Sequence, residues 1–382
     1  MKVVIIGGVA GGATAAARIR RLDEKAEIVV FERSGFISYA NCGLPYYIGG
    51  TIEDEGDLTL QTPESFYKRF RVKMNVRHEV TALHPESKMV TVKNIENGTV
   101  FTETYDKLIL SPGAKPIKPN FEGIDSDKIF TLRTVEDTLK IKKFINEKYP
   151  KSAVVVGGGF IGIEVAENLR ELGIDVTLVE AADQLMAPFD SDMASFIHAE
   201  LRKNGVNLML GRFVEGFADT DDGICVKLKN SPTLHANMVV MAIGVAPETT
   251  LAKDAGLELG IKGSIVVNDR METSVTDIYA VGDAVQIRNF VTDTDALISL
   301  AGPANKQGRI AADNICGIDS RYRGGQGSSV IKLFDMTAAS TGINEKTAEA
   351  AGIVYDKVVL SPVSHAAYYP GGQTMYMKVL YE

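Results

Sequence analysis

The chain of 382 residues is 45% hydrophobic and 24% charged, which is the composition of a folded globular protein rather than a disordered or fibrous one. Its 41 Lys and Arg against 49 Asp and Glu give a net charge of -8, which excludes a general basic field for nucleic acid or an anionic membrane. At roughly 100 to 200 residues per domain, we expect two or three domains.

The cysteines and the N-terminal residues indicate the cellular compartment of the protein. Cys42, Cys225 and Cys316 are too few and too scattered for a disulfide framework, and none forms a CxxC pair for zinc. The first apolar run stops at Gly7-Gly8, unlike a secretory signal, and no segment has the about 18 apolar residues of a membrane span. The five histidines show no metal spacing. We expect a cytoplasmic protein with no metal, nucleic-acid or membrane partner.

The first segment predicts a βαβ unit. Its parts are a strand, a glycine-rich turn, a helix and a second strand, over Lys2–Ile6, Gly7–Gly12, Ala13–Leu22 and Glu27–Phe31. The start of such a helix offers free N–H groups to a pyrophosphate. Glu32 ends the second strand, where a carboxylate can accept hydrogen bonds from ribose hydroxyls. Val9 replaces the middle glycine of the GxGxxG fingerprint.

A second unit fills every position of the same fingerprint. Strand Ala153–Val156 leads into Gly157–Gly162, then a helix through Leu172 and strand Val176–Val179. Glu180 follows that strand, and its carboxylate favours the free 2′-hydroxyl of NADH over the 2′-phosphate of NADPH. Ala181 and Ala182 supply no guanidinium for a phosphate. We expect NADH as the preferred nucleotide, with NADPH disfavoured.

A third signal lies far downstream, where a strand over Ile278–Val281 delivers Asp283 to a ligand at its carboxyl end. Gly282 permits close approach of the backbone. Two shorter segments, Leu110–Ala114 and Ala242–Pro247, stand between the glycine-rich units and this strand.

In this order, these motifs resemble the FAD- and NAD(P)-dependent pyridine nucleotide-disulfide oxidoreductases over nearly the whole chain. The resemblance implies an α/β fold with two Rossmann-like domains, one for FAD and one for NAD, and a partial C-terminal α+β interface domain. FAD would bind residues 1–115 and 246–325, and NAD(P)H would bind residues 116–245. Residues 326–382 would form the first part of the interface domain.

The resemblance also implies cofactor contacts. Glu32 would bind the adenosine ribose of FAD and Asp283 its ribityl chain. The remaining FAD contacts would be Gly7, Val9, Ala10, Gly11, Arg33, Asn41, Cys42, Val80, Ser111, Pro112, Gly113, Arg133, Gly282, Ala301 and Ala304. The nicotinamide nucleotide would contact Gly157, Gly159, Phe160, Ile161, Gly162, Glu180 and Gly244.

Cys42 is the candidate redox residue. Family members with an internal dithiol carry CxxxxC, and Tyr47 stands at the second position here, so the redox partner of Cys42 would be the flavin. Gly43-Leu44-Pro45 looks like a first helical turn, and a thiol at a helix N-terminus is stabilised as thiolate. The oxidised form would be a mixed disulfide with a small thiol or a sulfenic acid.

Within the single-cysteine branch, Ser38–Cys42 followed by Tyr46 is similar to the coenzyme A disulfide reductases, with Tyr39 where phenylalanine is usual. Residues that match the coenzyme A contacts of that branch are Thr14, Arg18, Arg21, Ser38, Asn41 and Lys306. The basic run Lys68–Arg71 we interpret as a solvated face. NADH peroxidases and oxidases carry a histidine in the first glycine turn, and Gly7–Gly12 has none.

The C-terminal segment from Val330 to Glu382 is expected to alternate strands, with a helix over Glu345–Ala351 and a last strand over Met375–Tyr381. The family's interface domain is longer, so we expect this one to be truncated. Where complete, it pairs two subunits and brings tyrosines to the other subunit's cysteine, which makes Tyr368 a second catalytic candidate and a homodimer the expected assembly.

The sequence thus predicts an enzyme of cell redox homeostasis that passes a hydride from NADH to FAD and two electrons through Cys42 to coenzyme A disulfide, a coenzyme A persulfide or polysulfide. Two alternatives stay open. One is an NADH oxidase or peroxidase that works through a Cys42 sulfenic acid. The other is a flavin-bearing redox sensor with little turnover.

Overall fold

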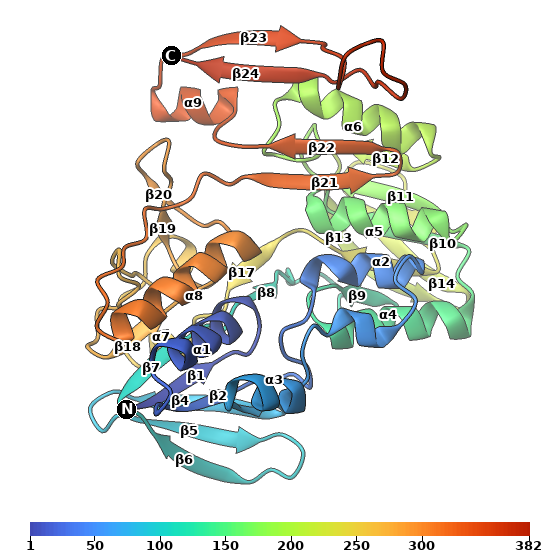
Figure 1. Cartoon of the computed structure of the whole chain (residues 1–382). Helices are drawn as coiled ribbons and strands as arrows, with labels where there is room; N and C mark the ends of the chain where they lie inside the picture. The colour runs from blue at the N-terminus through green and yellow to red at the C-terminus, as the bar shows by residue number, and fades with distance from the viewer.

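The computed structural model describes residues 1–382 and contains two five-stranded parallel sheets (Figure 1). The first sheet has the order β18-β7-β1-β2-β3 and every pairing in it is parallel. Its strands are β1 (Lys2–Ile6), β2 (Glu27–Phe31), β3 (Lys73–Asn75), β7 (Lys107–Leu110) and β18 (Ile278–Ala280). The expected strand pair of the first unit is confirmed, since β1 and β2 have the predicted bounds.

The second sheet repeats this arrangement with the order β12-β11-β10-β16-β9, again parallel throughout. Its strands are β9 (Ile129–Thr131), β10 (Ser152–Val156), β11 (Asp175–Glu180), β12 (Asn207–Leu210) and β16 (Met238–Met241). The mixed α/β fold with two Rossmann-like parallel cores is therefore confirmed.

Helices cover these sheets and connect them. They are α1 (Ala10–Leu22), α2 (Leu44–Gly49), α3 (Pro63–Phe70), α4 (Val135–Lys148), α5 (Phe160–Glu171), α6 (Ser191–Lys203), α7 (Thr250–Asp254), α8 (Ala301–Ile315) and α9 (Glu345–Ala351), with short 3-10 turns at Asn41–Gly43, Glu55–Leu58 and Ile261–Gly263. α1 begins three residues before the predicted Ala13, because the glycines of the turn already belong to its first turn. No helix is both long and apolar enough to cross a membrane.

Smaller antiparallel sheets complete the fold. Two have three strands: β4 (His78–His84) with β5 (Met89–Asn94) and β6 (Val100–Thr104), and β13 (Val214–Thr220) with β14 (Gly223–Leu228) and β15 (Leu234–Ala236). The pairs are β8 (Ala114–Pro116) with β17 (Val245–Pro247), β19 (Ile287–Arg288) with β20 (Asp295–Ala296), β21 (Ser329–Leu333) with β22 (Met336–Ser340), and β23 (Asp356–Leu360) with β24 (Met377–Tyr381).

The predicted domain boundaries stay a prediction. Those at 115/116 and 245/246 fall in the β8–β17 pair, where Lys115 is opposite Ala246. Beyond residue 326, the chain forms the two hairpins and α9 at the top of Figure 1. The predicted helix there matches α9, and the predicted last strand matches β24 within two residues.

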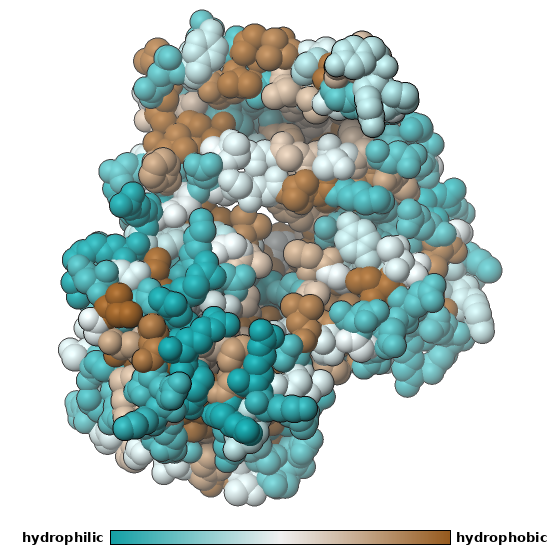
Figure 2. All heavy atoms as spheres, in the orientation of Figure 1, coloured by the Kyte–Doolittle hydropathy of each residue, from teal (hydrophilic) through white to brown (hydrophobic).

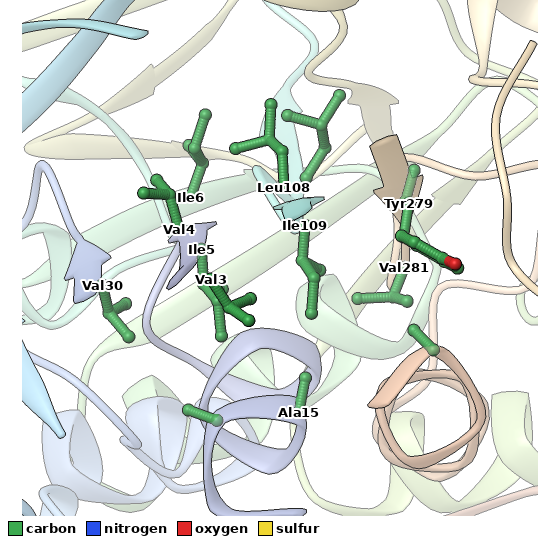
Figure 3. Close-up of a cluster of buried hydrophobic side chains, with 14 of the residues drawn as sticks. Val3, Val4, Ile5, Ile6, Ala15, Val30, Leu108, Ile109, Tyr279 and Val281 are labelled. Atoms are coloured by element: carbon green, nitrogen blue, oxygen red, sulfur yellow. The ribbon is translucent and has the colours of Figure 1, made fainter. Parts of the chain in front are cut away.

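The first core lies between the β1–β7 layer and the helices α1 and α8. Figure 3 shows Val3, Ile5 and Ile109 directed toward α1, and Val281 toward α8. A strand that is covered on both faces consists of consecutive apolar residues, which explains why Val3 to Ile6 are all apolar. α8 lies close to α1 because Gly308 has no side chain: a Cβ there would lie 2.5 Å from the carbonyl oxygen of Gly11.

Replacing Ile5 by alanine tests this core. The side chain is fully buried in the centre of the first sheet, so Ile5→Ala should destabilise the protein by about 2–5 kcal/mol through lost burial and a residual cavity. Thermal unfolding followed by circular dichroism measures the loss. Val330→Ala is the control, because Val330 is 66% exposed in β21, and an equal loss in both variants would contradict the core described here.

Candidate active site

A cavity of about 2110 Å³ lies among the two parallel sheets and the C-terminal hairpins. Figure 2 shows the surface hollowed between these parts. The predicted residues that line it are Gly7, Val9, Ala10, Gly11, Glu32, Arg33, Asn41, Cys42, Val80, Ser111, Pro112, Gly113, Arg133, Gly159, Phe160, Ile161, Gly244, Gly282, Asp283, Ala301 and Ala304. The fold therefore brings together residues that the sequence spreads over nearly three hundred positions.

At the first turn, Glu32 holds the backbone in place. The residue is 8% exposed, and its carboxylate accepts the N–H groups of Gly8 and Ser34, each at 2.8 Å. Burial raises the pKa of Glu32, and the two N–H groups partly oppose that rise. No side chain caps the start of α1, whose first residues Ala10 and Gly11 line the cavity, so its N–H groups are available to an anion.

The second turn is built in the same way. Glu180 accepts the N–H groups of Gly158 at 2.6 Å and Ala182 at 2.8 Å, and no side chain caps α5. The cavity lining does not include Gly157, Gly162 or Glu180. A Cβ at Gly162 would lie 1.9 Å from the carbonyl oxygen of Gly157, so this position requires glycine.

Arg133 and Asp283 meet at the cavity. Their side chains form an ion pair with 2.6 Å between Nη2 and Oδ2, and the Arg133 Nε donates to the carbonyl of Ala114 at 3.3 Å. Behind them, the N–H of Gly282 donates to Gln307 at 2.7 Å. Gln307 is 1% exposed, and the sequence analysis missed it because nothing local distinguishes a glutamine in a helix from a surface residue.

Cys42 lies in the 3-10 turn Asn41–Gly43, directly before α2, and its residue is exposed to the cavity. The predicted helical turn with an early Pro45 is confirmed. The expected stabilisation of the thiolate is wrong for this chain: burial raises the pKa of Cys42, and the negative charge of Glu164 raises it further. Cys225 and Cys316 are also free thiols.

Glu164 is the residue that sequence reasoning missed next to Cys42. It follows Phe160 by one helical turn on α5 and lines the same cavity. Burial and the charge of Glu167 raise the pKa of Glu164 to about 7. Burial and Glu164 also raise the pKa of Tyr46 to about 12. The i, i+4 spacing from the second fingerprint could have pointed to Glu164.

Asn41 supplies an observation that points to a bound ligand. Its side-chain oxygen is buried and has no hydrogen-bond partner, although the residue lines the cavity. A buried polar atom without a partner costs free energy, so a ligand donor at this place would stabilise the site. Together with the uncapped starts of α1 and α5, this fits two dinucleotides that fill the cavity.

A shallow groove of about 380 Å³ lies on the outer side of α1. Of the predicted coenzyme A contacts, Thr14, Arg21 and Ser38 line it, together with Arg69 and Arg309. Arg69 belongs to the basic run that we interpreted as a solvated face, and it is exposed while it also lines this groove. The sequence analysis missed Arg309, which α8 supplies from far along the chain.

Besides Gly157, Gly162 and Glu180, three further predicted residues line neither space. Arg18 pairs with Asp313 at 2.8 Å, and Lys306 is exposed on α8 outside the groove. Tyr368 is 91% exposed and lies outside the cavity of its own chain. Its predicted role at another subunit's cysteine stays a prediction.

Comparisons with known proteins agree with this geometry. A family model described as pyridine nucleotide-disulphide oxidoreductase matches residues 1–308. A coenzyme A disulfide reductase of Staphylococcus aureus (strain JH9) is 38% identical over 382 residues, which are all of this chain and 85% of that protein.

Among solved structures, reduced Bacillus anthracis CoADR-RHD is 48% identical with a TM-score of 0.97, over all of this chain and 68% of the other. An NAD-dependent persulfide reductase from A. fulgidus is 36% identical with a TM-score of 0.95, over all of this chain and 71% of the other. A water-forming NADH oxidase from Lactobacillus brevis, bound to NADH, is 32% identical with a TM-score of 0.95, over all of this chain and 84% of the other. The chain therefore belongs to the pyridine nucleotide-disulphide oxidoreductase family, a family of enzymes that use FAD and NAD(P)H.

Proposed function

We propose that this protein is an NADH-dependent flavoenzyme that reduces coenzyme A disulfide, or a coenzyme A persulfide or polysulfide, through Cys42. One observation carries the proposal: Cys42 is a single thiol in the cavity onto which both glycine-rich turns open. The curated and structural relatives named for coenzyme A disulfide and persulfide reduction support the substrate class.

The residues of the first turn fit FAD. Glu32 would hold the adenosine ribose, the uncapped start of α1 the pyrophosphate, and Asp283 the ribityl chain. Arg133 would keep Asp283 oriented through their ion pair. Bound there, FAD would supply the hydride acceptor and the two-electron donor that no amino-acid side chain provides.

The groove beside α1 fits the anionic part of coenzyme A. The molecule carries three phosphate groups, and this acidic protein gathers Arg21, Arg69 and Arg309 around one groove. The guanidinium groups of Arg21 and Arg69 lie 5.5 and 5.2 Å from the ring centroid of Phe70, which holds two cations on one aromatic ring. Arginine binds phosphate through paired hydrogen bonds.

The chemistry assigned to Cys42 is thiol–disulfide exchange. Its thiolate attacks one sulfur of coenzyme A disulfide, which gives the Cys42–coenzyme A mixed disulfide and one coenzyme A thiolate. Over the complete cycle, NADH, one proton and coenzyme A disulfide give NAD⁺ and two coenzyme A thiols. Burial raises the pKa of Cys42 and the negative charge of Glu164 raises it further, so protonation of Glu164 would favour the attacking thiolate.

Two further proposals concern assembly and location. The apolar residues Val359, Tyr369 and Tyr376 are more than half exposed in the C-terminal part of the chain, which supports a homodimer formed through this segment. The free cysteines support action in the reducing cytoplasm. The relationship to an NADH oxidase favours oxygen reduction as the second candidate function.

An anaerobic titration with NADH tests the function. On reduction, the oxidised enzyme should release one coenzyme A per subunit, and Cys42→Ser should release none. Turnover with coenzyme A disulfide should fall by about three orders of magnitude or more in Cys42→Ser, while FAD content and flavin reduction by NADH persist. Wild-type turnover in Cys42→Ser would contradict the proposal. Reduction without coenzyme A release, with rapid consumption of oxygen or peroxide, would favour the oxidase, and little turnover with any acceptor would favour a redox sensor.

The nucleotide preference is tested by Glu180→Ala combined with Ala181→Arg. Loss of the carboxylate acceptor should cost about 1 kcal/mol or more toward NADH, and the guanidinium should attract the 2′-phosphate of NADPH. The ratio of the two kcat/KM values measures the shift. Asp183→Ala, an acid in the same loop, should leave the ratio unchanged. A higher kcat/KM with NADPH in the unmodified protein would contradict the role of Glu180.

The electrostatic link between Glu164 and Cys42 is tested by alkylation. Glu164→Gln removes a negative charge that disfavours the thiolate, so the pKa of Cys42 should fall and its reaction with iodoacetamide should begin at lower pH. Rates measured against pH, with the labelled residue identified by mass spectrometry, give the midpoint. Glu171→Gln on the same helix is the control, because Glu171 acts on Tyr46 and not on Cys42. An unchanged midpoint in Glu164→Gln would exclude the link.

A further inference from the structure

The loop of residues 181–190, between β11 and α6, lies directly against the second glycine-rich turn. The N–H of Met186 donates to the carbonyl of Gly158 at 2.9 Å. The side chain of Leu185 lies so close that a Cβ on Gly158 would be 2.2 Å from its Cδ2. The end of the loop, from Ala187 to Asp190, lines the cavity. A displacement of the loop would therefore move the turn that we assign to the nucleotide.

The start of α9 holds this loop from the other side. The side-chain amide of Asn344 donates to the carbonyl of Ala187 at 2.9 Å. The backbone N–H of Glu345 donates to Asp190 at 2.9 Å, and the amine of Lys346 donates to Gln184 at 2.8 Å. Three successive residues of the C-terminal segment thus bind three separate places along the loop.

Lys378 on β24 forms the centre of this contact. Its side chain is 4% exposed, and its amine pairs with Asp190 at 3.1 Å, with Asp192 at 2.9 Å and with Glu345. Asp190 itself is 8% exposed. Burial acts to lower the pKa of Lys378, but hydrogen bonds to the three carboxylates outweigh it and raise that pKa. Hydrogen bonds to Lys357 and Lys378 lower the pKa of Glu345 to about 2.

A buried carboxylate is stable as an ion only with a partner. Without the amine of Lys378, the charge of Asp190 would remain buried and unpaired, with Glu345 and Asp192 beside it to repel it. Movement of Asp190 toward water would relieve this repulsion, and Asp190 ends the loop that contacts Gly158.

We infer that Lys378 is a positioning residue for the nicotinamide nucleotide: it fixes Asp190 and the 181–190 loop against the second glycine-rich turn, so that the C-terminal segment sets the affinity for NADH. This inference goes beyond the proposed function, because it does not depend on which acceptor Cys42 reduces. It also gives the C-terminal segment a role within its own chain.

The test compares nucleotide binding in Lys378→Met and Lys378→Arg, each loaded with FAD. Anaerobic titration with NAD⁺, followed by the change in flavin absorbance, gives the dissociation constant without turnover. In Lys378→Met, the dissociation constant for NAD⁺ should rise about tenfold, which is within the usual range for coupling between two sites, while the FAD content is unchanged. Lys378→Arg keeps a cation between the carboxylates and should restore most of the affinity. Lys357→Met is the control, since Lys357 pairs with Glu345 but not with the loop.

Unchanged NAD⁺ affinity in Lys378→Met would overturn the inference, as would an equal loss in Lys357→Met. If Lys378→Met does not retain FAD, Asp192→Asn decides, because Asp192 is 53% exposed and its amide keeps the shape of the contact. Its NAD⁺ affinity should fall by a smaller factor, and an unchanged value would then overturn the inference. Failure of the wild-type protein to bind either nicotinamide nucleotide would instead contradict the proposed function.

Discussion

The close contact of α1 and of α5 with the strand before each of them is the constraint on which the site depends. A Cβ at Gly12 would lie 1.9 Å from the carbonyl oxygen of Gly7, and the same value holds between Gly162 and Gly157. Because no side chain separates helix from strand, α1 and α5 begin at the carboxyl edges of their sheets. Their free N–H groups therefore face one shared cavity, where a phosphate group can approach them.

Two carboxylates fix the conformation of these turns. Glu32 accepts the N–H of Gly8 and Glu180 that of Gly158, and each accepts a second N–H two residues farther along the chain. The acid that follows β2 or β11 therefore stabilises the backbone of the glycine-rich turn through these hydrogen bonds, without any ligand. This explains why Val9 can replace a fingerprint glycine: the turn is held by Gly7, Gly12 and Glu32, and position 9 lies at the cavity wall.

Local sequence patterns were sufficient for the two βαβ units, for the acids at their strand ends and for part of the C-terminal segment, because those features depend on neighbours in the chain. The parallel strands, the helix over Glu345–Ala351 and the turn before Pro45 were found in this way. The contacts between segments that are distant in the chain were not predicted. The raised pKa of Cys42 follows from burial and from the charge of Glu164 on α5, and the groove that Arg69 lines is completed by Arg309 of α8. Neither follows from a local pattern, since each requires the tertiary arrangement.

Helix α5 connects the cavity with the C-terminal strands. Its first turn presents Phe160 and Ile161 to the cavity, and its second presents Glu164, whose charge acts on Cys42. One turn farther, Glu167 is 1% exposed and accepts the N–H of Phe334 at 2.6 Å and the amine of Lys332 at 3.2 Å.

The C-terminal strands therefore hold the far end of the helix whose near end forms the second glycine-rich turn. The charge of Glu167 also helps to raise the pKa of Glu164, so this contact acts on the cavity through electrostatics as well as through position. The cavity that holds Cys42, the second glycine-rich turn and the C-terminal hairpins therefore all meet at α5.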